Sequence, residues 1–137
     1  MEFFINKNST LPKLKMELVN DGRNDFRKFY EKIQNATITF TMYNVESKVK
    51  KISCSPSYIE MSVANDCENS EMPTYFITYQ FTEQETNKYG RYNGYFTINF
   101  LDGTGTLITP IRDELFINVL DNWYIKNNLV YLYLKSF

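Results

Sequence analysis

Hydrophobic and polar residues alternate with a period of two along most of the chain, the pattern of strands that bury one face. In residues 92–100, one set of alternate positions is apolar or glycine, and the other set is polar or tyrosine. The strands predicted in this way span residues 14–18, 37–42, 48–53, 58–62, 75–81, 92–100 and 115–119. Short strands that recur between turns predict a mainly β protein, an antiparallel β-sandwich.

Residues 25–34 break the alternation. Phe26, Phe29, Tyr30 and Ile33 fall at i, i+3, i+4 and i+7, which gives one apolar stripe on a helix. Asn24 or Asp25 can cap its start. The sequence therefore predicts one short amphipathic helix at about 25–34, which covers an open end of the sheet.

Both ends of the chain differ from the central region. Residues 1–12 lack a clear period and end at Pro12, so we expect an extended N-terminal arm before a sandwich domain at 13–121. Residues 122–137 predict a C-terminal hairpin whose second strand is apolar on both sides; it is either buried in this domain or packed on another subunit, and we favour the second. The possible protein-interface residues are Phe3, Phe4, Trp123, Tyr124, Ile125, Val130, Tyr131, Leu132, Tyr133 and Leu134.

Composition narrows the function classes. The chain has 137 residues, suited to one domain, with a net charge of -1 and no basic run, so nucleic acid is not expected as the main partner. No signal peptide or membrane-spanning run is recognisable, which favours a protein made and kept in a cytoplasm until assembly. Histidine is absent, and with it the commonest general base and metal ligand.

The remaining candidates for chemistry are weak. Asp66, Glu68 and Glu71 form an acidic loop that invites a calcium hypothesis, but the spacing and glycine of an EF-hand are missing. The other close carboxylates are Glu83 with Glu85 and Asp113 with Glu114, and Cys54 and Cys67 have no histidine to activate them. We therefore predict no catalytic, metal or cofactor site, and no enzymatic activity.

Sugar binding stays an alternative. Tyr89, Tyr95 and Trp123 are candidates for exposed rings, and flat aromatic faces stack on sugars. Outward tyrosines also occur at sheet edges and subunit contacts. We favour contacts over sugars and keep a carbohydrate-binding or adhesin module as the alternative function.

The glycines at 90–105 fit no phosphate loop, because the glycine pair precedes a strand instead of following one. Gly90, Tyr92 and Gly94 instead match the tyrosine-corner pattern G-x-Y-x-C of immunoglobulin-like sandwiches, with Gly94 in place of the cysteine. In such a corner the tyrosine hydroxyl ties the start of the strand to backbone upstream. These three residues are the predicted structural corner.

A longer pattern resembles a known family. The segments "ITFTM", "YFITYQFTEQETNKYGRYNGYFTINFLDG" and "TPIRDELFINVLD", which lie within residues 36–121, resemble the Ig-like domain of tailed-bacteriophage structural proteins, the BppU N-terminal type. The resemblance implies an immunoglobulin-like fold and a non-enzymatic virion component in a tail, neck ring or baseplate. The N-terminal arm and the C-terminal hairpin suit contacts between neighbouring copies, so we expect a homo-oligomeric ring, with other virion structural proteins as further partners and no membrane.

Overall fold

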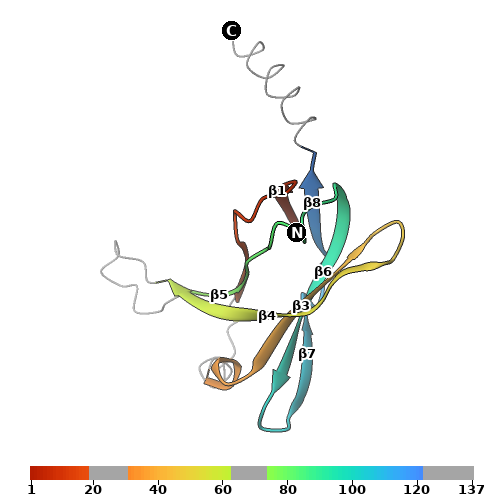
Figure 1. Ribbon diagram of the computed structural model, residues 1–137. Coiled ribbons are helices and arrows are strands. Elements are labelled where there is room, and N and C mark those ends of the chain that lie inside the picture. The colour runs from red at the N-terminus through yellow and green to blue at the C-terminus, as the bar shows by residue number, and fades with distance from the viewer. Residues whose placement is uncertain (19–30, 63–73, 122–137) are drawn as a thin grey trace.

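The computed structural model of the protein describes residues 1–18, 31–62 and 74–121. Within them the chain is mainly β, as the alternation predicts, and residues 31–34 are helical (Figure 1). The strands are β1 (Glu2–Asn6), β2 (Leu14–Leu18), β3 (Thr37–Asn44), β4 (Lys50–Ser62), β5 (Thr74–Tyr79), β6 (Gly90–Phe100), β7 (Gly105–Thr109) and β8 (Leu115–Leu120).

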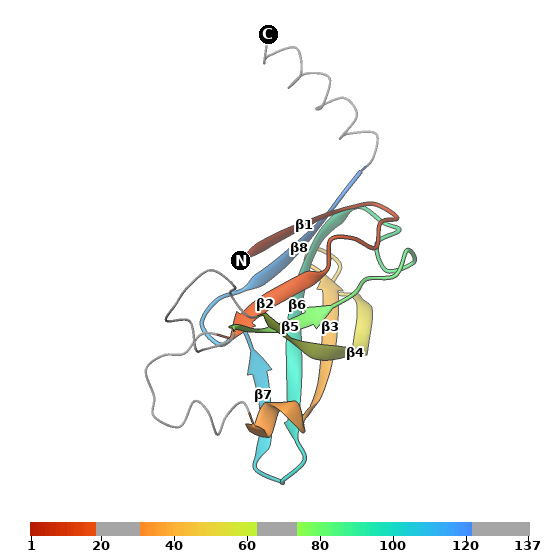
Figure 2. The ribbon, with the colours of Figure 1, turned by 90° about the vertical axis from the view of Figure 1, so that its left-hand side faces the viewer.

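The strands form one sheet that folds into two layers, in the order β1-β8-β6-β3-β4-β5-β2. The long strand β4 belongs to both layers, because residues 50–57 pair with β3 and residues 58–62 pair with β5 (Figure 2). The first layer is therefore β1-β8-β6-β3-β4 and the second is β4-β5-β2. With β2 as strand B, these layers have the GFCC′ and BED strand order of an immunoglobulin-like sandwich.

The strand position next to β6, on the side away from β3, is shared by two strands, β7 and β8. Both β7 and β8 pair with β6, with Phe96 opposite Thr109 but Gly94 opposite Leu115, so residues 110–114 bulge out between them. The alternation predicts β8 but misses β7, which lies between the predicted strands at 92–100 and 115–119. The two strands predicted at 48–53 and 58–62 are parts of the single strand β4.

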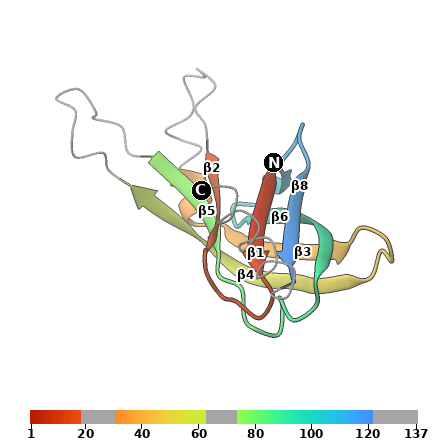
Figure 3. The same cartoon turned by 90° about the horizontal axis from the view of Figure 1, so that it is seen from above.

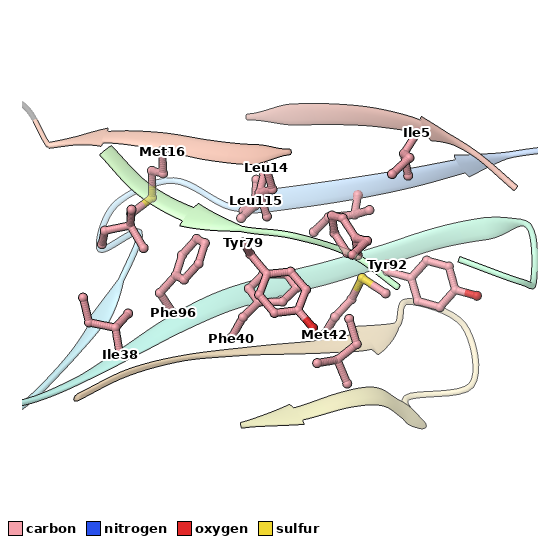
Figure 4. Packing of buried hydrophobic residues seen from close by; sticks show 14 of the residues in the cluster. Ile5, Leu14, Met16, Ile38, Phe40, Met42, Tyr79, Tyr92, Phe96 and Leu115 are labelled. Atoms are coloured by element: carbon pink, nitrogen blue, oxygen red, sulfur yellow. The ribbon is translucent and has the colours of Figure 1, made fainter. Parts of the chain in front are cut away.

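The core lies between the two layers and is built on aromatic rings. Phe40 of β3 is fully buried, and its ring lies 4.7 Å from that of Tyr79, 5.0 Å from Phe96 and 5.9 Å from Phe81 (Figure 4). Tyr79 comes from the second layer, so these contacts hold the layers together. The alternation in β3 and β6 points the rings of Phe40 and Phe96 into this core.

The prediction of a separate N-terminal arm is wrong for residues 2–6. They form β1, which pairs with β8 in parallel, an exception among the otherwise antiparallel strand pairs of the described residues (Figure 3). Ile5 is buried, and the Phe3 ring stacks on Phe81 at 5.9 Å. The alternation of β1 is faint in the sequence because only one of its five residues, Ile5, is fully buried.

Parts of three predictions lie outside the described residues. Of the predicted helix, residues 31–34 are helical and Ile33 is buried, whereas 25–30 are outside the described ranges. The acidic loop at 63–73 and the C-terminal segment 122–137 are outside them too.

Candidate functional site

The predicted corner residues lie where β6 begins. The Tyr92 hydroxyl donates a hydrogen bond to the Lys88 carbonyl at 2.9 Å, the bond to upstream backbone that defines a tyrosine corner. Burial raises the pKa of this hydroxyl. Gly90 has a φ of 149°, which a side chain rarely tolerates. The arrangement fixes the entry of β6 and holds no ligand group.

Gly94 has a packing role. A Cβ built on it would lie 2.7 Å from Ile117 Cδ1 and 2.8 Å from Phe40 Cζ. In antibody domains a cysteine of the inter-sheet disulfide occupies this position. Here the Phe40 ring and Ile117 fill the space, so core packing stands in place of the disulfide.

The turn at residues 82–85, which follows β5, is closed by a reciprocal pair of hydrogen bonds between Thr82 and Glu85. The Glu85 amide donates to Thr82 Oγ1 at 3.3 Å, and the Thr82 amide donates to Glu85 Oε1 at 2.9 Å, as in a capping box. The Tyr79 hydroxyl donates to Glu85 Oε2 at 2.7 Å. Glu85, one of the sequence's candidate catalytic carboxylates, is thus occupied in holding the turn at residues 82–85 and the Tyr79 hydroxyl.

The outward surface of the first layer gathers aromatic side chains that the sequence separates widely. Phe4 of β1 is 55% exposed, and Tyr43, Tyr95 and Phe116 are half-buried on the outward sides of β3, β6 and β8. Their neighbours Ile5, Met42, Phe96 and Ile117 point into the core, which fixes the outward direction. We call this outward surface, defined by these four rings, the aromatic face.

The cross-strand register places one row of residues across the whole aromatic face. Glu2 pairs with Phe116, Phe116 with Asn93, Asn93 with Tyr43, and Tyr43 with Lys50. The row therefore reads Glu2, Phe116, Asn93, Tyr43, Lys50, one residue from each of the five strands. A register shift between Met42, which pairs with Ile52, and Tyr43 leaves one extra residue in β4 and brings Lys50 opposite Tyr43. We call it the central row.

Arg91 organises the β1 side of the face. Its guanidinium lies over the Phe116 ring, 3.9 Å from the centroid, and its Nη2 is 2.8 Å from Glu2 Oε1. A guanidinium stacked on an aromatic ring is held in one orientation and stays partly desolvated. On the other side, Lys48 Nζ lies 5.8 Å from the Tyr43 ring centroid.

Of the predicted interface residues within the described ranges, only Phe4 is exposed on this face. Phe3 points the other way, is half-buried and packs on its own core, and its interface role stays a prediction. Trp123, Tyr124, Ile125 and the residues of 130–134 lie outside the described ranges. Sequence reasoning missed Phe116, Arg91 and Tyr43, although the outward positions of β6 and β8 were visible in the alternation.

The tyrosines proposed for sugar binding are spread out. Tyr89 is 62% exposed in the corner before β6, whereas Tyr95 lies on the aromatic face. They are six positions apart in the sequence, roughly 20 Å along a strand. The two rings are therefore too far apart to share a single sugar ring, and Trp123 is outside the described residues.

The remaining acidic and cysteine candidates from the sequence form no site within the described residues. Asp113 lies in the bulge before β8, where its Oδ2 accepts a hydrogen bond from the Met1 amine at 3.0 Å, an ion pair that lowers the Asp113 pKa. Cys54 is a free, exposed thiol. Asp66, Cys67, Glu68 and Glu71 are outside the described residues. Among residues 1–18, 31–62 and 74–121, no three His, Cys, Asp or Glu side chains group as metal ligands would.

Comparisons with protein-family models, with curated proteins and with solved structures found no match. In the described part of the chain, no helix has the length and apolar character needed to cross a membrane.

Proposed function

We propose that the protein is a non-enzymatic immunoglobulin-like docking module. In this proposal it assembles with copies of itself and with other virion structural proteins in a tail, neck ring or baseplate of a tailed bacteriophage. The virion setting rests on the resemblance of residues 36–121. The docking role rests on the aromatic face, which is the observation that carries the proposal.

The side chains of this face are of the kinds that protein interfaces favour. Aromatic residues and arginine are enriched at interface cores, whereas lysine and glutamate are depleted there. The centre of the face holds Phe116, Tyr43 and Arg91, and the lysines and Glu2 lie towards its edges. Arg91 is already oriented by Phe116, so little conformational entropy is lost when a partner covers it.

Sedimentation velocity of the full chain over a range of concentrations tests the docking role. We expect concentration-dependent association that Phe4→Ser and Phe116→Ser each weaken by about tenfold, because each removes a large apolar contact. Met61→Ser is the matched control, since Met61 is 58% exposed, like Phe4 at 55%, but lies in the second layer. Association that both phenylalanine variants leave unchanged would contradict the proposal.

The virion role has a separate test. A tagged full chain, located by negative-stain microscopy of assembled particles, is expected at a tail, neck or baseplate. Particles that assemble and infect without incorporating the chain would exclude a structural role.

The alternative is a carbohydrate-binding module, and one observation favours it. Tyr43 and Tyr95 face outward around Asn93, so flat rings adjoin an amide that can bind hydroxyl groups. A glycan array read with the wild type and with Tyr95→Ala separates the two functions. Glycan binding that Tyr95→Ala abolishes would replace the docking role, and an empty array removes the alternative.

A further inference from the structure

We infer that the aromatic face binds the aromatic face of a second copy of this chain, and that the two copies are related by a two-fold axis running along β6. This inference rests on the proposed docking role and specifies its partner and geometry. It comes from the order of residues in the central row, whose two halves are complementary to each other.

The central row has an acid at one end and a base at the other. Glu2 lies on the edge strand β1, and Lys50 lies four strands away on β4, roughly 19 Å across the sheet at the usual strand spacing. Lys48 adds a second positive charge beside Tyr43. Glu46 in the β3–β4 turn is the nearest acid in sequence, and it precedes both lysines.

A two-fold axis along β6 pairs the two halves of the row. It places Glu2 opposite the Lys50 of the other copy, and Phe116 opposite the other Tyr43. Asn93, in the middle, meets its own equivalent, and an amide carries both donors and an acceptor, so two such side chains can bond to each other. Acid thus meets base, ring meets ring and amide meets amide.

The other in-plane axis is unfavourable. A two-fold axis along the central row would place Lys50 against the other Lys50 and Glu2 against the other Glu2. Like charges that face each other across an interface cost free energy and select against that arrangement. The charge gradient therefore selects the axis parallel to the strands.

The position of Arg91 agrees with this geometry. Arg91 is on β6, so an upright side chain would meet its own positive charge across the axis. Instead the guanidinium leans over Phe116 on β8 and binds Glu2. This displacement moves the two guanidinium groups to opposite sides of the axis. Each then faces the Tyr43 side of the other copy, where Lys48 also lies, a like-charge approach that weakens the pair.

The size of the face sets the strength of the pair. Five strands of five or six paired residues cover on the order of 400–500 Å² per copy, below the roughly 800 Å² of a standard interface. We therefore expect a weak pair that dissociates on dilution. Within a larger assembly, weak pairs of this kind gain strength from multivalency, and a two-fold contact combines with rings into dihedral symmetry.

A charge-exchange experiment on the full chain tests the pairing. Glu2→Lys gives a face with positive charge at both ends, and Lys50→Glu gives one with negative charge at both ends. By sedimentation velocity at low salt, each variant alone is expected to associate about tenfold more weakly than the wild type, and an equimolar mixture to regain near-wild-type association. Glu83→Lys, an exposed acid outside the face, is the control and should leave association unchanged.

The outcomes separate the two proposals. Association lost in Phe116→Ser, without recovery in the charge mixture, would keep the docking face and overturn the two-fold pairing. Wild-type association by both Phe4→Ser and Phe116→Ser would remove the docking face itself. Glu2→Lys also breaks the ion pair with Arg91. If this variant does not fold, Lys50→Glu is the test by itself, and wild-type association by Lys50→Glu overturns the pairing.

Cross-linking tests the axis directly. With Cys54 and Cys67 replaced by serine, Asn93→Cys is expected to give a covalent dimer with a bis-maleimide that spans roughly 10 Å, the face-to-face spacing of packed sheets, because the axis passes beside this position. Lys50→Cys should not, since its two copies lie roughly 19 Å apart in this arrangement. The reverse result, with cross-linking at position 50 and none at 93, would overturn the proposal.

Discussion

The Tyr92 hydroxyl lies 2.9 Å from the carbonyl oxygen of Lys88, to which it donates a hydrogen bond across the turn before β6. Tyr92 is 2% exposed, so little water is available to replace this bond. We predict that Tyr92→Phe lowers the free energy of unfolding by about 1 kcal/mol, the usual contribution of one buried hydrogen bond. Urea denaturation measures the loss. Tyr89→Phe, which alters an exposed ring three residues earlier, is the control; an equal loss there would contradict a specific role of the corner.

Gly94 is predicted to be intolerant of any side chain. Gly94→Ala would bring a methyl group 2.7 Å from Ile117 Cδ1, and overpacking of this kind costs about 1–3 kcal/mol. Ile117→Val removes that Cδ1 atom. In the wild type it should cost about 0.5–1.5 kcal/mol, but combined with Gly94→Ala it should cost less, because it relieves the contact with Ile117 and leaves only the contact with the Phe40 ring.

A double-mutant cycle of these two changes, measured by chemical denaturation, gives the coupling. We expect a favourable coupling above about 0.5 kcal/mol. Additive effects would mean that the backbone of β6 moves away from the new methyl group and that Ile117 does not limit the space.

Local pattern was enough to predict much of this fold. Alternation identified the inward residues of β3, β6 and β8, and the G-x-Y-x-G spacing identified the corner at Tyr92. In each case the information lies within one or two consecutive elements. Strand β7 was missed because Gly105 and Pro110 bound a segment of only five residues, which looks like a turn.

The aromatic face could not be predicted in the same way. Phe4, Tyr43 and Phe116 come from distant parts of the sequence, and only the strand register brings them onto one surface. The parallel pairing of β1 with β8 has no local signal, because nothing in residues 2–6 specifies a partner more than one hundred residues away. Site prediction therefore failed where it depended on register.

Glu85 is predicted to matter for stability and not for catalysis. Glu85→Ala removes the acceptor of the Tyr79 hydroxyl and of the Thr82 amide, and we expect a loss on the order of 2 kcal/mol. Glu85→Gln keeps one acceptor oxygen and should lose less. Thermal unfolding of both variants, with the exposed neighbour Glu83→Ala as a near-neutral control, checks the ranking. Equal effects of Glu83→Ala and Glu85→Ala would argue against the capping-box role.

Two buried tyrosines predict a loss of stability in alkaline solution. Burial, with the Glu85 carboxylate as a further cause, raises the pKa of Tyr79 above its ordinary value of 10.0, and burial also raises that of Tyr92. The folded chain therefore holds these protons more tightly than the unfolded chain, whose tyrosines ionise near pH 10. Their contribution is complete below that pH and is lost as the pH rises from about 10 through the raised values. Denaturation series between about pH 8 and 11 should show this fall. Tyr79→Phe should flatten it and Tyr89→Phe should not; a fall of the same slope in Tyr79→Phe would assign the alkaline transition to other groups.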